Sequence, residues 1–175
     1  MLIELRKGMP LHPCTFHAVV APEKVIISAL NNNKDLQRFL FLYVSGNYSR
    51  FLSSINRSSK NFEVRRAFTV HQLFTILKEA NHTILFLEHD PTLFDGAEEM
   101  IPQIAGMLKD IGHESLVILY APSVDRSFSV LMRQADHIIE ITPNNDLTDT
   151  ALYRSYQGHR NRDVSPHAQQ TLEVS

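Results

Sequence analysis

Short, uninterrupted apolar runs alternate with amphipathic stretches along most of this chain. The clearest runs lie at residues 15–20, 39–44, 83–87, 116–120 and 137–141. Runs of this length and continuity are typical of strands buried on both faces, as in a parallel sheet covered by helices. The stretches between them place apolar residues at helical spacing. The alternation therefore predicts an α/β domain with about five or more mostly parallel strands.

Two of the expected helices carry capping signals at their first turn. Thr69 is followed three residues later by Gln72, and at this spacing each side chain can bond a free backbone N–H group of the helix start. Asp95 and Glu98 give a similar signal for the next helix, which Gly112 is well placed to end. These signals predict where the two helices begin and end.

The composition changes toward the end of the chain. A weaker strand is expected at 62–68 and an edge strand at 151–156, and the sequence beyond is polar. Polar termini of this kind are often disordered. We therefore expect a single folded domain over residues 1–156 and a disordered polar tail over residues 157–175.

The composition also excludes several classes of protein. Of the 175 residues 43% are hydrophobic, which is enough for a core without disulfides or metal ions. A net charge of -2 gives no overall attraction to nucleic acid, so such binding needs a local patch. Cys14 is the single cysteine, which excludes an internal disulfide and a cysteine zinc cluster. Because free cysteines are usually buried, we expect this thiol to be buried too.

Nothing in the sequence predicts contact with a membrane. Every apolar run is much shorter than the roughly 18 residues that cross a bilayer. Arg6 and Lys7 are not followed by the apolar core of a secretory signal. We expect a soluble cytoplasmic protein, or a nuclear one in a eukaryote.

The order of these elements resembles the core domain of the RecA, RadA and KaiC superfamily of P-loop ATPases, over residues 13–156. An Arg-Ala pair at 66–67 stands before a helix, as it does ahead of the Walker B strand in that superfamily. The run 84–87 followed by Glu88 is similar to the Walker B strand, and 134–139 is similar to the final strand. The resemblance implies a RecA-like three-layer α/β/α sandwich that assembles into oligomers.

The phosphate-binding loop is where the sequence departs from that superfamily. The loop reads G-x-x-x-x-G-K-[ST], and its glycines, lysine and hydroxyl bind phosphate and magnesium. The corresponding stretch has no glycine; Pro22 removes an N–H donor, Glu23 adds a negative charge and Val25 replaces the hydroxyl. Lys24 is either a relic of the loop lysine or a solvated helix residue. We therefore predict that the binding of ATP and magnesium is lost.

Glu88, His89 and Asp90 follow the most apolar run, at the end of a strand, where α/β proteins collect ligands. The resemblance makes Lys24, Glu88 and Asp90 the residues of a vestigial nucleotide site. The two acids could instead bind a metal ion or act as a general base. Against that, neighbouring residues of an extended chain point to opposite faces. The nine histidines are scattered along the sequence, which argues against a metal cluster.

Basic and aromatic residues are interleaved near the end of the chain, which suits single-stranded nucleic acid: charge follows the phosphates and rings stack on the bases. The resemblance adds two arginines in a segment that includes a DNA-contacting loop in the superfamily. The candidate nucleic-acid-binding residues are Arg126, Arg133, Tyr153, Arg154, Tyr156, Arg160 and Arg162. The alternative is that they are ordinary solvated side chains.

Bulky apolar side chains also occur near expected loops and helix starts, at Phe51, Leu52, Phe94 and Met100. Since RecA-type domains assemble edge to edge, these residues are candidates for a subunit interface. The alternative is that they pack in the core.

The sequence supports three hypotheses for function. We favour a non-catalytic RecA-like paralogue that is an accessory or assembly subunit in DNA recombination or repair. It would bind a partner protein such as a RecA-type recombinase, and single-stranded DNA as well where a basic patch forms. The first alternative is a KaiC-like signalling or scaffold module that forms homo-oligomers. The second is a nucleotide- or metal-dependent enzyme that uses Glu88 and Asp90.

Overall fold

The computed structural model describes residues 3–6, 8–33, 36, 38–142 and 151–155. In this part of the chain, strands form a two-stranded hairpin and a seven-stranded sheet. The strands are β1 (Ile3–Arg6), β2 (Met9–Leu11), β3 (Phe16–Val20), β4 (Phe41–Ser45), β5 (Phe62–Arg66), β6 (Ile84–Glu88), β7 (Leu116–Ala121), β8 (His137–Ile141) and β9 (Ala151–Ser155). The α-helices are α1 (Glu23–Asn32), α2 (Val70–Glu79), α3 (Ile101–Gly112) and α4 (Arg126–Leu131). Short 3-10 helices are η2 (Leu52–Ser54), η3 (Pro91–Phe94), η4 (Glu98–Met100) and η5 (Met132–Gln134).

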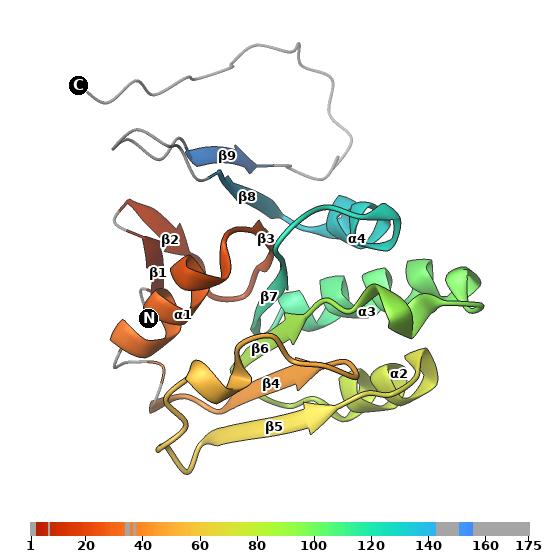
Figure 1. Ribbon diagram of the computed structural model, residues 1–175, viewed down its shortest axis with the longest axis horizontal. Helices are drawn as coiled ribbons and strands as arrows, with labels where there is room; N and C mark the ends of the chain where they lie inside the picture. The colour runs from red at the N-terminus through yellow and green to blue at the C-terminus, as the bar shows by residue number, and fades with distance from the viewer. Residues whose placement is uncertain (1–2, 7, 34–35, 37, 143–150, 156–175) are drawn as a thin grey trace.

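The seven-stranded sheet has the strand order β5-β4-β6-β7-β3-β8-β9 (Figure 1). Strands β3 to β8 are parallel to their neighbours, and β9 runs antiparallel to β8 at one side. In register, Val20 of β3 is level with Ala121 of β7, and Tyr120 of β7 is level with Glu88 of β6. The ends of β3, β6 and β7 therefore meet along one edge of the sheet, which we call the carboxyl edge. The mostly parallel sheet predicted from the sequence is confirmed.

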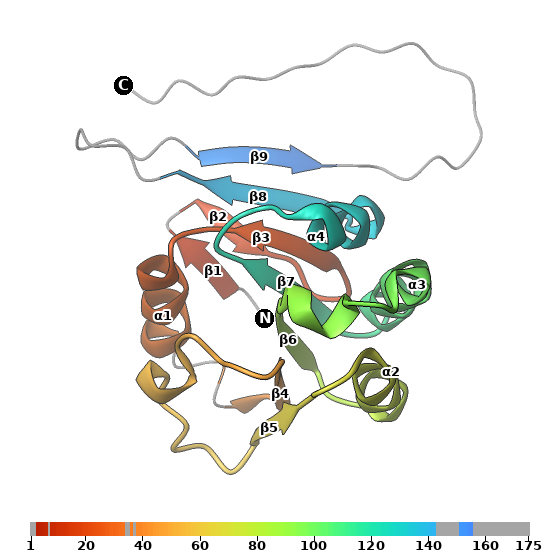
Figure 2. The same cartoon turned by 45° about the vertical axis from the view of Figure 1, so that its right-hand side comes forward.

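Two apolar cores fill the space on the two faces of the sheet. Helices α2, α3 and α4 cover one face, and α1 covers the other together with the β1–β2 hairpin (Figure 1, Figure 2). Side chains alternate along the strands, so Ala18 and Val20 of β3 pack under the three helices while Val19 packs toward α1. The result is the expected three-layer α/β/α sandwich.

The antiparallel β1–β2 hairpin is an element that the sequence analysis does not predict. Ile3, Leu5 and Leu11 are buried from this hairpin into the same core as Ile26 of α1. Gly8 has a φ of 84°, a left-handed conformation that suits glycine at the turn between the two strands. The hairpin and α1 together cover one face of the seven-stranded sheet and so form one layer of the sandwich.

The first turn of α2 has the capping arrangement that the sequence predicts. Thr69 Oγ1 accepts a hydrogen bond of 3.2 Å from the N–H of Gln72. In return, Gln72 Oε1 accepts a hydrogen bond of 2.7 Å from the N–H of Phe68, one residue before the cap. Two backbone donors at the start of the helix are therefore satisfied by side chains.

Helix α3 begins later than the sequence predicts. Asp95 and Glu98 indicate a start in this region, but α3 begins at Ile101. Gly96 has a φ of 73°, which no α-helix contains, and it separates η3 from η4. Gly112 is the last residue of α3, as expected.

Two predictions about single side chains need correction. Cys14 is exposed, not buried. It has a φ of 54° in the turn that leads into β3, and its thiol contacts the carbonyl oxygen of Glu114 at 3.6 Å. Of the four candidates for a subunit interface, Phe51, Leu52 and Phe94 are buried and Met100 is half-buried against the core, so the alternative of core packing describes them better. None of the helices in the described residues is long and apolar enough to span a bilayer.

Candidate functional site

Several segments that the sequence analysis singled out lie at the carboxyl edge of the sheet, together with Asp125. Glu88 ends β6, Ala21 and Pro22 follow β3, and Asp125 caps the start of α4 after β7. Open α/β sheets bind ligands at this edge, because strand ends and helix starts converge there. The carboxyl edge is therefore where a functional site is expected.

The connection between β3 and α1 is two residues long, Ala21 and Pro22. The N–H of Ala21 donates to the carbonyl oxygen of Ala121 over 3.3 Å. Its own carbonyl oxygen accepts a hydrogen bond of 3.1 Å from the Tyr120 hydroxyl. Since Pro22 has no N–H, this connection offers no free backbone donor.

The start of α1 carries a negative side chain and few free donors. No side chain caps the helix, and the N–H of Val25 donates to the carbonyl oxygen of Pro22 over 3.0 Å. The carboxylate of Glu23 lies in the first turn, 3.8 Å from the guanidinium of Arg50, and both side chains are about half exposed. Lys24 is exposed and makes no ion pair with another described residue. A phosphate bound here would be repelled by the charge of Glu23, and few free N–H groups would converge on it.

Glu88 is buried at the end of β6, where its carboxylate accepts three hydrogen bonds. The hydroxyl of Tyr43 donates one of them. The hydroxyl of Ser49 and the N–H of Arg50 each donate another at 2.7 Å. Burial and then the charge of Glu88 raise the pKa of Tyr43, so its phenol stays protonated and remains a donor. The acid that resembles a Walker B residue thus fastens β6 to the segment that follows β4.

Asp90 fastens the same two segments a little further along the chain. Its Oδ2 accepts a hydrogen bond of 2.9 Å from the N–H of Asn47, and its Oδ1 accepts bonds from the N–H and hydroxyl of Thr92 at 3.0 and 2.7 Å. Gly46 packs so closely against the Asp90 side chain that a Cβ there would lie within 3.0 Å of it. We call this arrangement the Asp90 clamp.

His89 points to the other face of the sheet. Its Nε2 lies 2.7 Å from Asp125 Oδ2 and 3.3 Å from the hydroxyl of Ser127. Burial lowers the pKa of His89 despite the nearby carboxylate. Burial acts to raise the pKa of Asp125, but hydrogen bonds from Phe128 N–H, Ser127 and His89 outweigh it and the pKa is lowered. A neutral His89 next to an ionised Asp125 therefore carries its proton on Nε2.

This His–Asp–Ser group lacks the geometry of a catalytic triad. In such a triad the serine and the aspartate bond to different nitrogens of the histidine. Here Ser127 and Asp125 both face Nε2 of His89, and Ser127 donates to Asp125 Oδ1 over 2.8 Å. The group instead joins the end of β6 to the start of α4. Residues 88–90 therefore have separate partners, as the alternation of an extended chain predicts.

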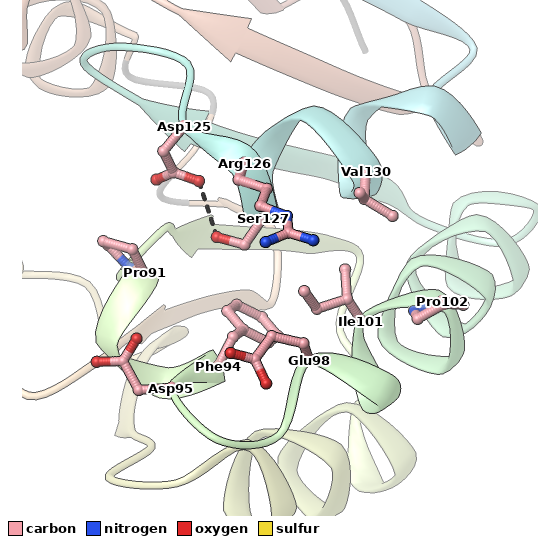
Figure 3. A pocket seen from close by; sticks show the side chains of 10 residues that line it. All are labelled: Pro91, Phe94, Asp95, Glu98, Ile101, Pro102, Asp125, Arg126, Ser127 and Val130. Atoms are coloured by element: carbon pink, nitrogen blue, oxygen red, sulfur yellow. Dashed lines mark hydrogen bonds between the residues drawn. The ribbon is translucent and has the colours of Figure 1, made fainter.

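A cavity of about 350 Å³ opens at the carboxyl edge between the η3–η4 segment and the starts of α3 and α4. Phe94, Ile101 and Val130 supply apolar surface to it. Figure 3 shows Arg126 on one side of the cavity and the carboxylates of Asp95 and Glu98 on the other. The sequence indicates none of this, because the lining comes from three separate elements.

Only two of the arginines expected to bind nucleic acid, Arg126 and Arg133, have described side chains. Arg126 lies at the start of α4 beside the cavity, and Arg133 is exposed in η5, beyond the other end of that helix. The remaining candidates lie outside the described side chains. They are Tyr153, Arg154, Tyr156, Arg160 and Arg162, and the same holds for the predicted tail 157–175.

Three of the nine histidines have their rings close together at the opposite edge of the sheet, which their scatter along the sequence does not suggest. The ring centroids of His17 and His137 are 4.8 Å apart, and those of His12 and His137 are 5.6 Å apart. Burial, followed by the neighbouring His137, lowers the pKa of His17 to about 3. In the described part of the chain no group of three or more histidine, cysteine or acidic side chains is arranged to hold a metal ion.

Comparison with known sequences finds a relative but no matching family. No protein-family model matches the sequence. An uncharacterized protein of Archaeoglobus fulgidus is 38% identical over 125 residues, which are 71% of this chain and 63% of that protein. The chain therefore spans less than two thirds of the length of this relative.

Two solved structures share the fold at low sequence identity. A KaiC-like protein of Pyrococcus horikoshii has a TM-score of 0.56 at 13% identity, over 90% of this chain and 86% of that one. The flagellar accessory protein FlaH of Methanocaldococcus jannaschii has a TM-score of 0.55 at 12% identity, over 86% of this chain and 82% of that one. The chain therefore has the RecA-like α/β/α fold of KaiC-like proteins.

Proposed function

We propose that this protein is a RecA-fold accessory subunit that acts by assembling with a partner protein and does not turn over a nucleotide. The observation that supports this most directly is the state of Glu88. Its carboxylate already accepts three internal hydrogen bonds from Tyr43, Ser49 and Arg50. A carboxylate used in this way has little capacity left for magnesium or for an attacking water.

The start of α1 supports the same proposal. Nucleotide phosphates bind in this fold class where several free N–H groups converge at a helix start. Here both backbone groups of Ala21 bond within the protein, Pro22 has no donor, and Glu23 adds a carboxylate. Glu88 and Asp90 both bond to the protein's own loops, which favours a structural role for them over the alternative of an enzyme that uses these two acids.

The partner that we propose is a recombination or repair protein of the RecA type. This part of the proposal rests on the order of elements, and the binding of single-stranded DNA rests on the arginines near the chain end. A homo-oligomeric scaffold is the second candidate, because one of the two similar folds belongs to a KaiC-like protein. The two candidates differ in whether the second subunit is another protein or another copy of this chain.

Light scattering on the purified chain, combined with native co-purification, tests the proposal. The account predicts a complex with another protein whose amount is unchanged by Mg–ATP, and a chain that stays monomeric alone over a wide range of concentration. Growth of a homo-oligomer with concentration would favour the scaffold instead. An assembly that forms only with Mg–ATP would contradict both.

Fluorescence anisotropy tests the DNA part separately. If basic residues contact phosphates, binding to single-stranded DNA must weaken steeply as salt is raised. Changing Arg154, Arg160 and Arg162 to Ala should then reduce both the affinity and its salt dependence. Absence of binding at low salt would leave a protein partner as the ligand.

A further inference from the structure

The cavity at the carboxyl edge is built to accept an apolar group. Its volume of about 350 Å³ is larger than one aromatic side chain, and Phe94, Ile101 and Val130 line it. Its walls are fixed: Asp125 caps α4 and bonds His89 and Ser127, which holds α4 against the end of β6. The cavity is therefore a preformed depression with an apolar floor.

The charges around the cavity are not paired with one another. Neither Asp95 nor Glu98 forms an ion pair with another described residue, and the same is true of Arg126. Asp125 is already occupied by its three internal hydrogen bonds. The free charge at the cavity is therefore two carboxylates against one guanidinium, which favours a ligand that is basic beside its apolar part.

The carboxyl edge of the sheet also exposes large apolar side chains. Among the described residues, Tyr48, Phe68 and Val124 are 87%, 56% and 48% exposed. They follow β4, β5 and β7, so all three lie in loops of the carboxyl edge. Exposed aromatic and apolar residues on the same edge of a sheet as a pocket are typical of protein–protein interfaces.

The Asp90 clamp restrains the loop that carries Tyr48. Asp90 bonds the N–H of Asn47, next to Tyr48, and also bonds Thr92 in the η3 segment that lines the cavity. Asn47 Nδ2 donates to Thr92 Oγ1 over 3.3 Å as well. Tyr48 therefore follows a residue that is bonded to the segment lining the cavity, and this restraint lowers the entropy cost of using Tyr48 in an interface.

We propose that the cavity and Tyr48 form the docking surface for a partner protein, which inserts one bulky apolar side chain and sets a neighbouring Lys or Arg against Asp95 and Glu98. A carbonyl oxygen of the same segment accepts from Arg126. This rests on the proposed function as a partner-binding subunit and names the segment by which the partner is held.

Selection of a phage-displayed library of random peptides against the purified full chain tests the proposal. The expected consensus has Phe, Leu or Tyr next to Lys or Arg. The consensus peptide is then labelled, and its affinity is measured by fluorescence anisotropy. No nucleotide or native partner takes part, so failure here is distinct from the discovery that the chain assembles only with Mg–ATP.

Four variants sharpen the result. Val130→Trp fills the cavity and should weaken binding at least about tenfold, and the exposed change Tyr48→Ala should weaken it by about fivefold without affecting folding. Glu98→Lys should weaken the basic peptide about tenfold and improve a version with Glu in place of its Lys or Arg. Glu114→Lys, the same charge change at an exposed site near the opposite edge of the sheet, should have no effect. Three results would overturn the proposal. The selection could give no consensus, or the consensus could lack a basic residue. The third is an affinity that is unchanged in both Val130→Trp and Tyr48→Ala.

Discussion

The hydroxyl of Tyr43 donates a hydrogen bond to the buried carboxylate of Glu88, between the neighbouring strands β4 and β6. This contact places the acid at the end of β6 inside the protein's own hydrogen-bond network. In an ATPase of this fold class the same position would be needed for chemistry on the nucleotide. The hydrogen bond from Tyr43 therefore favours the interpretation that Glu88 stabilises the carboxyl edge over the interpretation that it is catalytic.

Changing Glu88 to Gln should destabilise the protein. The amide cannot accept from three donors, because one of its two ends carries N–H groups that face them. We expect a loss of about 1.5–3 kcal/mol in the free energy of unfolding, measured by urea denaturation. Glu114→Gln, at an exposed site, is the control and should change little. An unchanged unfolding free energy in Glu88→Gln would show that the network does not hold the fold together.

Gly46→Ala should also be destabilising, because the added methyl group would lie within 3.0 Å of the Asp90 side chain. The expected loss is about 1–3 kcal/mol, as for other overpacked sites. Gly106→Ala is a matched control inside α3, where nothing beyond the backbone of the helix itself lies within 4 Å of the new methyl group. That change should stabilise the protein by up to about 1 kcal/mol. Equal thermal unfolding of the two variants would contradict the Asp90 clamp.

Acid should destabilise the fold through His17. Its pKa is lowered to about 3 by burial and then by His137, against 6.5 for the free side chain. The unfolded chain therefore takes up the proton first, so stability is complete above about pH 6.5 and falls as the pH is lowered below it. His17 alone should cost about 2 kcal/mol between about pH 7 and about pH 5.

Denaturation at several pH values measures this effect, with His17→Gln as the comparison. The pKa values of His89 and His137 are also lowered, so some dependence should remain in that variant. A wild-type slope no steeper than that of His17→Gln would mean that His17 is not buried in its neutral form.

Cys14 should react with a thiol reagent in the native protein, without denaturant, because the side chain is exposed. Its φ of 54° disfavours any residue with a Cβ. Cys14→Gly should therefore be about 1 kcal/mol more stable than Cys14→Ala, measured by thermal unfolding. A thiol that reacts only after unfolding would show that the Cys14 side chain is buried in the native protein.

The strands of the sheet were predictable because their signal is local. Each of the five apolar runs is a strand, and Thr69 and Gln72 cap α2 much as their spacing indicates. The β1–β2 hairpin was missed although Ile3 and Leu5 alternate correctly, because its two strands are short and the residues between them give only Gly8 as a turn signal.

The candidate site was predictable only in position. The sequence places Glu88 and Asp90 at a strand end, but their partners Ser49 and Asn47 lie about forty residues away, and only the pairing of β4 with β6 brings them close. The left-handed φ of Cys14 could not be predicted from the sequence either, since it depends on the direction of the chain between two elements. The cavity needs three elements at once, and no local pattern describes it.

The most direct test of the central claim is a calorimetric titration of the chain with Mg–ATP. Because the start of α1 lacks converging N–H donors and Glu88 is already bonded, we predict no saturable binding tighter than about 1 mM. Lys24→Ala and Glu88→Gln should then give the same flat titration. Saturable binding at micromolar concentration that either variant removes would contradict the account.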